Sequence, residues 1–517
     1  MFKTMFSPSA TVLLFSLACL GVVAAQNPAA PKERSHVERF STPEVRAERS
    51  ESDATAKLAT NPKDDAALNM RSVARMRLGR YNEALEDLRG AIALKPGNAE
   101  YQANFGYVLW KLGRAEEAVS AERAALKIDS KNTTAHYQLG RFLLRLGDRK
   151  DLAEAISELR RAQELDPRQY EVRFELIAAY RELGDLAQAA AQLDVLQDSR
   201  PTDPRVFYVT GLLDADRNDL NSAVRNFNEA IKRDPTLYGA WQDLGLAYVK
   251  ANRWDEAVKV FSDLTQRQPN SVEAAYFHAL SLYNAGDMTK AEAETRRALR
   301  VDAGAVEAHT LLGIVLASRG NANVEAADAL SQAIALNPNS FDAQFYLGRV
   351  QYAMKDYAGA VKSLRTAAQL NPRHVEARFF LGTALESAGE SDAAMAEYQS
   401  LAKSDPNSAI GQLGLGALLV KQGKVDEAVA VLKRAATLDP SEFEAHWALG
   451  RALALQENYA GAVVSFERAI ALAPNRSDAH YQMGLSLRRL GRTAEANREF
   501  AIVERLNTEF RNSSNPR

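Results

Sequence analysis

Apolar residues recur along most of the chain with the spacing of short amphipathic helices arranged in pairs. Between residues 238 and 271, Trp241, Leu244 and Tyr248 fall at i, i+3 and i+7, which is one face of a helix. A second apolar stripe follows around Phe261, after a short polar interruption. The pattern therefore predicts two helices joined by a tight turn.

The small and turn-forming residues of the same stretch predict how this hairpin closes. Asn252 lies in the interruption, and asparagine tolerates the left-handed backbone that ends a helix. Gly245 and Ala257 are small where the two helices would approach each other, and Pro269 ends the second helix. A single hairpin of this kind cannot bury both of its stripes, so we expect copies to stack on each side.

This unit recurs with a period of 34 residues from Asp65 to about Phe510. The small residue of the second helix is alanine in all thirteen copies: Ala84, Ala118, Ala155, Ala189, Ala223, Ala257, Ala291, Ala326, Ala360, Ala394, Ala428, Ala462 and Ala496. The spacing is broken by three inserted residues near 148–151 and by one near 321–323, both in predicted turns. Alanines in register predict one repeat array rather than several globular domains.

Two further features mark the ends of the predicted helices. Ten copies end in proline: Pro96, Pro167, Pro201, Pro235, Pro269, Pro338, Pro372, Pro406, Pro440 and Pro474. Nine turns carry glycine: Gly79, Gly113, Gly147, Gly184, Gly286, Gly320, Gly389, Gly423 and Gly491. Lys355 and Glu457 depart from this pattern, so a different helix cap is expected in those two turns.

Taken together, the fixed positions read W-x2-L-G-x2-Y, then A-x3-F, then P, a pattern that resembles the tetratricopeptide repeat. The resemblance implies an all-α fold, a right-handed superhelical solenoid of about thirteen stacked helix–turn–helix hairpins. It also implies that the first helix of each hairpin lines a concave groove through its second, fifth, ninth, twelfth and thirteenth positions. The expected role of such a groove is to bind proteins.

The flanks of the array predict three further segments. Residues 1–25 resemble a secretory signal peptide, with Lys3 before an apolar run that is short for a membrane span. Residues 26–64 are polar and are expected to form a flexible linker with a weak capping helix at 44–61. The solenoid spans 65–510, and 511–517 form a polar tail.

The predicted signal peptide places the protein in the cell envelope or outside the cell. Cleavage after Ala25 is expected, with an uncleaved anchor as the alternative. The only cysteine, Cys19, could carry a lipid, but Ser16 stands where a lipoprotein signal has an aliphatic residue. We therefore expect an exported protein that is periplasmic or extracellular, without disulfides after cleavage.

Composition and motifs give no sign of catalysis. The net charge of -2, with 46% hydrophobic and 25% charged residues, is that of an ordinary soluble protein and favours neither a nucleic-acid nor a membrane-surface partner. Gly411, Gly414 and Gly416 lie inside a predicted helix and lack the strand that precedes a phosphate-binding loop. We expect no catalytic residue, no cofactor and no metal.

Histidines recur at one position of the repeat. His136, His309 and His446, together with His480, stand where Trp241 stands in its own copy. They are tens of residues apart, so packing rather than metal ligation is expected.

Candidate binding residues lie on the implied groove. Its fifth position is aromatic in eight copies: Tyr137, Phe174, Tyr208, Tyr276, Phe345, Phe379, Trp447 and Tyr481. An aromatic ladder suits an extended peptide because rings offer a large contact area at low entropic cost. The alternative is that these rings pack between neighbouring first helices.

Charged groove positions add a second candidate. Arg141 and Arg145, with Asn104, match three of the five positions with which chaperone-binding members of the family hold a peptide carboxylate. Asn69 and Val73 depart from the other two. This pattern predicts a site for a carboxylate at Arg141 and Arg145 but argues against a cytosolic chaperone as the partner.

The function predicted from these observations is a non-catalytic protein-binding scaffold of the cell envelope. The alternative is an accessory subunit that holds a substrate or partner for an enzyme, a glycosyltransferase or a secretion or assembly complex. The last repeat ends without a solvating helix after it, so self-association at that end is a further hypothesis.

Overall fold

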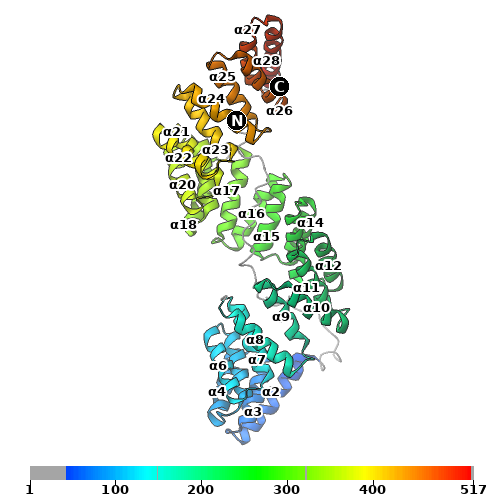
Figure 1. The fold of residues 1–517 in the computed structure, drawn as a ribbon. Coiled ribbons are helices and arrows are strands. Elements are labelled where there is room, and N and C mark those ends of the chain that lie inside the picture. The colour runs from blue at the N-terminus through cyan, green and yellow to red at the C-terminus, as the bar shows by residue number, and fades with distance from the viewer. Residues whose placement is uncertain (1–41, 148–149, 321–322, 514–517) are drawn as a thin grey trace. The chain divides into compact units, whose positions relative to one another are not determined.

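A computed structural model describes residues 42–147, 150–320 and 323–513, and these residues form 27 α-helices and no strand (Figure 1). None of these helices is both long and apolar enough to cross a bilayer. The predicted signal peptide and most of the predicted linker lie outside the described residues, as do 148–149 and 321–322 of the two insertions. The helical hairpins predicted from the sequence are present.

The chain divides into two compact units between Gln266 and Arg267. The helices of the first unit are α2 Pro43–Thr60, α3 Asp65–Arg77, α4 Tyr81–Leu94, α5 Ala99–Lys111, α6 Ala115–Ile128, α7 Thr133–Leu146, α8 Leu152–Leu165, α9 Tyr170–Leu183, α10 Leu186–Ser199, α11 Pro204–Asp216, α12 Leu220–Arg233, α13 Tyr238–Lys250 and α14 Trp254–Arg267. From α3 onward they form repeats one to six.

The second unit holds repeats seven to thirteen. Its helices are α15 Val272–Asn284, α16 Met288–Val301, α17 Val306–Arg319, α18 Asn323–Leu336, α19 Phe341–Ala353, α20 Tyr357–Leu370, α21 Val375–Ser387, α22 Ser391–Ser404, α23 Ala409–Lys421, α24 Val425–Leu438, α25 Phe443–Leu455, α26 Tyr459–Leu472, α27 Ser477–Arg489 and α28 Thr493–Ser513. Odd-numbered helices from α3 onward are the first helices of their repeats, and even-numbered ones are the second.

The small residues predicted at the helix contacts are where the two helices of each hairpin meet. All thirteen register alanines are fully buried. In repeat six, a Cβ at Gly245 would lie 2.4 Å from the ring of Phe261, so only glycine lets this ring cross the first helix. Phe261 is itself fully buried, whereas Trp241 is only half-buried. The core of repeat six therefore forms around Phe261 rather than around Trp241.

The turns correct one prediction. Lys355 and Glu457 adopt the same left-handed conformation as the turn glycines, with φ of 65° and 63°. No different cap is used there. The hairpin geometry needs a left-handed residue at this point, and the packing of both helices holds Lys355 and Glu457 in it despite the clash of the Cβ atom.

The first unit begins with a helix that belongs to no complete repeat. Helix α2 starts at Thr42, whose hydroxyl caps Val45, and it buries Ala47, Ala54 and Leu58 against α3. Glu51 of α2 accepts hydrogen bonds from Arg75 (3.0 Å) and Arg80 (2.9 Å). Residues 43–60 therefore stand where the second helix of a preceding repeat would stand.

At the other end, α28 runs on to Ser513, so residues 511–513 continue the last helix instead of forming a separate tail. Phe500 packs against the buried residues Leu487 and Ala496. Ile502, Val503 and Leu506 are half-buried. The last apolar face is thus only partly covered within repeat thirteen.

One core residue breaks the apolar pattern of the repeat. Glu122 of α6 occupies the position that Phe261 fills in repeat six, and it is fully buried. Neither carboxyl oxygen has a hydrogen-bond partner among the described residues, and burial raises the pKa of Glu122 well above its usual range. Gly106 provides the space, since a Cβ there would lie 2.6 Å from Oε1 of Glu122.

Candidate functional site

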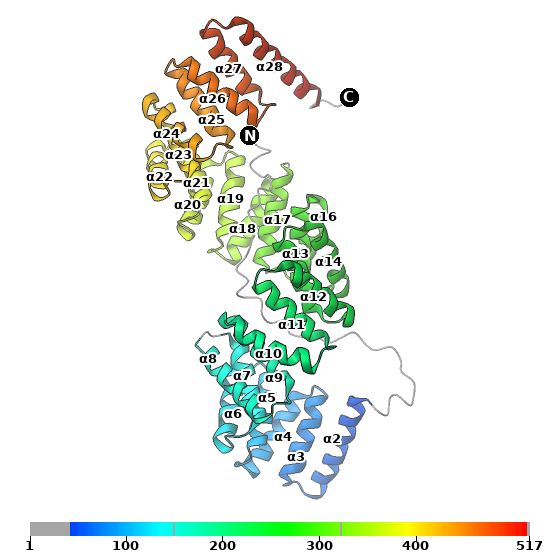
Figure 2. The ribbon, with the colours of Figure 1, turned by 45° about the vertical axis from the view of Figure 1, so that its right-hand side comes forward.

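Consecutive first helices, such as α3, α5 and α7, lie side by side within each unit (Figure 2). Polar side chains link them at a constant separation of 35 residues: Asn69 with Asn104 (3.0 Å), Tyr208 with Asp243 (2.7 Å), Tyr283 with Ser318 (3.3 Å) and Ser387 with Tyr352 (3.2 Å). These links identify one continuous face of the first helices in each unit, called the inner face below. The predicted binding residues all belong to it.

The predicted aromatic residues do not form a uniform ladder. Tyr276 and Phe345 are buried, whereas Tyr481 is 47% exposed. The other five are half-buried: Tyr137, Phe174, Tyr208, Phe379 and Trp447. Packing between helices thus accounts for some of these rings, and several of the others keep part of their surface accessible.

In the first unit, the charged groups around these rings are largely engaged with one another. The guanidinium of Arg145 donates to Glu175 (3.2 Å), and Arg181 donates to Asp216 (2.5 Å). Arg141 lies 5.7 Å from the centre of the Tyr137 ring, at cation–π distance. The structure brings Tyr137, Arg141 and Arg145 together on α7, but Arg145 already has a carboxylate partner.

The remaining predicted rings of the first unit are covered in a similar way. Arg205 lies 4.5 Å from the centre of the Phe174 ring and also donates to Asp203 (2.7 Å). Tyr208 donates to Asp243, and burial raises the pKa of Asp243 to about 6 although the Tyr208 hydroxyl and Arg181 act against that rise. The charged groups and rings on the inner face of repeats three to six are therefore largely paired with one another.

The second unit contains a dense group of rings that the sequence identified only in part. Phe345 lies at its centre, with Tyr346 at 5.2 Å, His374 at 5.3 Å and Phe380 at 6.0 Å between ring centres. We call this group of rings the aromatic cluster. It consists of residues on α19 and α21 and of the N-cap of α21: Phe341, Phe345, Tyr346, His374, Phe379 and Phe380. Only Phe345 and Phe379 were predicted from the fifth position.

Arg349 lies among these rings. Its guanidinium carbon is 5.4 Å from the centre of Phe345, 5.6 Å from Tyr346 and 4.9 Å from Phe380. Burial lowers the pKa of this guanidinium, while the nearby Tyr346 and Glu376 act in the opposite direction. Burial also raises the pKa of Tyr346 to about 12. Of the residues that the fifth position did not identify, Tyr346 and Phe380 stand at the sixth position of their helices and Arg349 at the ninth.

Three carboxylates stand at the second position of three consecutive first helices, α17, α19 and α21: Glu307, Asp342 and Glu376. None of them forms a hydrogen bond or an ion pair with a residue that the structure describes. Burial alone raises the pKa of Asp342 to about 6. The pKa of Tyr276 is raised by burial and then by the charges of Glu307 and Asp342. We call these three residues the carboxylate row.

The recurring histidines have a common structural role. Nε2 donates to the carbonyl six residues earlier in His136 (3.1 Å), His309 (3.0 Å), His446 (3.1 Å) and His480 (3.0 Å). Trp241 does the same through its indole N–H (3.1 Å), and Gln344 through its amide (3.4 Å). We call this hydrogen bond the clasp, because in these six repeats it joins the first helix to the end of the preceding repeat.

Within 42–147, 150–320 and 323–513, no three His, Cys, Asp or Glu side chains come together in a way that could hold a metal ion. In each of the four histidines, one ring nitrogen donates the clasp hydrogen bond. In His136 and His480, Nδ1 faces a glutamate as well, Glu158 and Glu499 respectively. The position is thus one of packing and hydrogen bonding.

Sequence comparison identifies the family. Profiles described as tetratricopeptide repeat match residues 69–133, 104–167, 148–213, 208–272, 242–304, 278–324, 323–368, 347–409 and 413–477. These matches cover well over half of the chain. The chain therefore belongs to the tetratricopeptide repeat family, and an array of such repeats is a protein-interaction scaffold.

Curated relatives match only short stretches. The Saccharomyces cerevisiae Superkiller protein 3 is 30% identical over 79 residues, 15% of this chain and 6% of that protein. The Arabidopsis thaliana inactive TPR repeat-containing thioredoxin TTL3 is 39% identical over 75 residues, 14% of this chain and 11% of that protein. A co-chaperone with tetratricopeptide repeats and a J domain, DNJ1 of Cryptococcus neoformans, is 32% identical over 96 residues, 18% of each chain.

The chain is also similar to two solved structures. The APC/C hetero-tetramer Cut9–Hcn1 has 14% sequence identity and a TM-score of 0.46, covering 91% of this chain and 95% of that one. Yeast Tom70 has 14% identity and a TM-score of 0.37, with 88% and 98% covered.

Proposed function

We propose that this scaffold binds a basic, extended segment of a partner protein on the inner face of α17, α19 and α21. The observation that carries the proposal is the carboxylate row beside the aromatic cluster. Three acidic side chains in consecutive repeats form no ion pair with a described residue. A partner that supplies lysine or arginine would pair with them.

The environment of Asp342 also favours a cationic partner. Its carboxylate is partly removed from water, as the raised pKa of about 6 shows, yet it gains no hydrogen bond in return. A buried charge without a partner is costly, and a cation placed beside it recovers that cost. Binding of a cationic side chain is therefore favoured at this site more than at a fully hydrated carboxylate.

The adjacent rings suit the same ligand. Phe341, Tyr346, Phe379 and Phe380 each keep part of their surface accessible. A lysine or arginine that pairs with Glu376 or Asp342 can lay its stem or its charged head on such a ring. Arg349 already makes this kind of contact with three of the rings, so the cluster accommodates a guanidinium.

A peptide-binding experiment tests the proposal. A fluorescein-labelled peptide with arginine at every second position is titrated with the full chain, and anisotropy is measured. The triple substitution Glu307→Gln, Asp342→Asn and Glu376→Gln should weaken binding at least about tenfold, since three charge-assisted contacts are lost. Binding should also fall as ionic strength rises.

Matched controls come from the first unit. Glu175→Gln and Asp216→Asn change inner-face carboxylates that already have an arginine partner, and they should leave the affinity for the arginine peptide within about twofold. A peptide with glutamate in place of arginine should not bind. Equal loss in the triple variant and the controls would show that net charge, not this surface, governs binding.

We also propose that the protein acts outside the cytoplasm, on the basis of the signal-like residues 1–25. Mass spectrometry of the chain purified from its own cells should give an N-terminus at Gln26. Recovery of the intact chain in the soluble cytoplasmic fraction would contradict export.

A further inference from the structure

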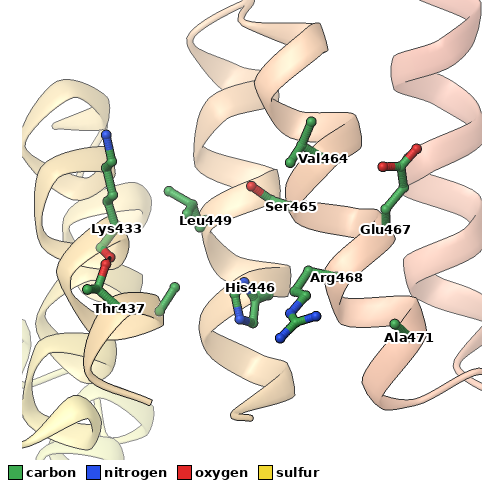
Figure 3. Close-up of a pocket in the computed structure, with 10 residues that line it drawn as sticks. Lys433, Thr437, His446, Leu449, Val464, Ser465, Glu467, Arg468 and Ala471 are labelled. Atoms are coloured by element: carbon green, nitrogen blue, oxygen red, sulfur yellow. Dashed lines mark hydrogen bonds between the residues drawn. The ribbon is translucent and has the colours of Figure 1, made fainter. Parts of the chain in front are cut away.

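A hollow of about 590 Å³ lies on the outer surface of the second unit, away from the carboxylate row and the aromatic cluster. Figure 3 shows its lining, which comes from α24, α25 and α26. Lys433 and Thr437 belong to α24, and His446 and Leu449 of α25 lie between the two second helices. We call this hollow the outer groove.

The wall formed by α26 is a regular helical stripe. Val464, Arg468 and Ala471 stand at i, i+4 and i+7, so they follow one another along the helix. Such a stripe extends over roughly 10 Å at the rise of an α-helix. The groove therefore runs along the second helices instead of crossing them.

The apolar side chain of this stripe is exceptional in the array. Val464 is 65% exposed, more than any other large apolar residue of the described chain. The equivalent residue of every other repeat is small or polar: Glu86, Ser120, Ser157, Ala191, Arg225, Lys259, Ala293, Asp328, Lys362, Ala396, Ala430 and Arg498. Only repeat twelve thus places a branched apolar side chain at this outward position, beside the lining residues Leu449 and Ala436, which are themselves buried.

The outer groove also carries unpaired positive charge. Lys433 on one wall and Arg468 on the other have no ion pair with a described residue. The lining includes one carboxylate, Glu467, and in Figure 3 this carboxylate points away from His446 and Arg468. The accessible charge of the groove is therefore positive.

The clasp explains why Arg468 has no partner. In repeats seven and eleven, the equivalent arginines donate to the carbonyl that ends the preceding repeat, Arg297 to Pro269 (3.2 Å) and Arg434 to Pro406 (3.0 Å). In repeat twelve, His446 donates to that carbonyl, Pro440 O. Arg468 lies beside His446 in Figure 3 and is left facing the groove.

We propose that the outer groove binds an acidic amphipathic helix of a partner protein. Its apolar stripe would cover Val464, and acidic residues flanking that stripe would pair with Lys433 and Arg468. A helix fits because the groove lies between two helices and has walls with residues at helical spacing, into which the ridge of a third helix packs. This site is independent of the basic segment proposed for the inner face.

The test uses the full chain and two synthetic helical peptides. Both carry leucine at i, i+4 and i+7, and they differ only in flanking glutamate or flanking lysine. The glutamate peptide should bind by fluorescence anisotropy, and the lysine peptide should not. Val464→Asp should weaken binding about tenfold or more, because it places a like charge in the apolar centre of the contact.

The matched control is Ala430→Asp, which makes the same change at the equivalent exposed position of repeat eleven, outside the lining. It should leave the affinity within about twofold. Arg468→Glu should lower the affinity for the glutamate peptide and allow the lysine peptide to bind. Circular dichroism of each variant checks that the helices are retained.

Three results would overturn the proposal. One is equal binding of both peptides, and another is equal loss in Val464→Asp and Ala430→Asp. The third is concentration-dependent dimerisation of the chain that Val464→Asp abolishes, since the groove would then be occupied by a second copy. The triple inner-face variant should bind the glutamate peptide as the unmodified chain does, which separates this site from the proposed function.

Discussion

The inner faces of repeats three to five and of repeats eight to ten use the same repeat positions but treat charge in opposite ways. In the first region, Arg145 and Arg181 each meet a carboxylate of the next first helix. In the second region, the carboxylate row forms no ion pair with a described residue, and Arg349 lies among rings. The two surfaces thus differ in whether their charged side chains already form ion pairs within the chain.

The comparison shows that residue type at a groove position is a poor guide to availability. Tyr208 and Phe379 both stand at the fifth position and are both half-buried. Tyr208, however, is held by Asp243, whereas Phe379 faces Phe380 and Tyr398. Whether a groove ring is available for binding depends on the side chain that faces it from the next first helix, because consecutive first helices lie side by side.

The largest expected effect concerns the ring at the centre of the aromatic cluster. Phe345→Ala should lower the free energy of unfolding by about 3–5 kcal/mol, because a buried ring leaves a cavity. Tyr137→Ala in the first region should cost about 1–2 kcal/mol, since its ring is already half-exposed. Urea unfolding followed by circular dichroism measures both.

Hydrogen exchange locates the loss. Protection should fall mainly in α17 to α22 for Phe345→Ala, because each repeat is stabilised by its immediate neighbours. Uniform loss over the whole second unit would contradict this local picture.

The second prediction concerns the buried carboxyl of Glu122 in repeat two, in the first unit. Glu122→Leu should raise the free energy of unfolding by about 2 kcal/mol, because an unsatisfied buried polar group is replaced by the residue that other repeats carry there. The raised pKa of Glu122 means that the folded state keeps a proton that the unfolded state loses. Stability should therefore be highest below the unfolded pKa and fall as pH rises, and Glu122→Leu should remove this decline.

The third prediction concerns how stability depends on pH, which should have opposite signs in the two regions. The pKa of Asp342 is raised to about 6 by burial, so its contribution to stability should be lost as pH rises from about 4 to about 6. Asp342→Asn should therefore gain about 1–2 kcal/mol relative to the unmodified chain at pH 7.5 and nothing at pH 4.

Asp203 supplies the opposite case. The hydrogen bond from Arg205 lowers the pKa of Asp203, so its stabilising effect is present above the unfolded pKa and is lost as pH falls through the folded one. Asp203→Asn should therefore destabilise at pH 7.5 and approach neutrality in acid. Equal signs for the two substitutions in urea titrations at both pH values would remove the distinction.

The smallest effect is expected in the turns. Lys355→Gly in repeat nine should stabilise by about 0.5–1 kcal/mol, because glycine adopts a φ of 65° without steric cost. Gly184→Ala in repeat four, at a φ of 82°, should destabilise by about 1 kcal/mol. A change in melting temperature of the same sign for both would contradict the left-handed requirement.

The sequence predicted the fold through features that each repeat carries by itself. The register alanines, the turn glycines and the terminal prolines are local signals, and they located the helices correctly. The conformation of Lys355 was not predicted, because the neighbouring helices, not the residue, impose it. The helical continuation of α28 to Ser513 was missed for a similar reason, since a polar composition does not by itself end a helix.

The candidate site was less predictable because it depends on contacts between repeats. The fifth-position aromatics were identified, but the sequence could not separate the buried Phe345 from the exposed Tyr481. Phe380 was missed because it stands at the sixth position, which the family pattern does not assign to the groove, and Arg349 was missed although its ninth position is a groove position. The separation of 35 residues in the pairs Tyr208 with Asp243 and Arg181 with Asp216 is the signal that could have shown which charges are already satisfied.

The clasp has a consequence for how such an array can evolve. It requires only an N–H at one position and a backbone carbonyl six residues earlier, and tryptophan, histidine and glutamine all supply the donor here. Because the acceptor is main chain, a duplicated or transplanted repeat finds it in any neighbour. Exchange of the donor among tryptophan, histidine and glutamine should therefore preserve the hydrogen bond, whereas Leu68, Phe207 and Ala275 at the same position show that the array also tolerates its absence.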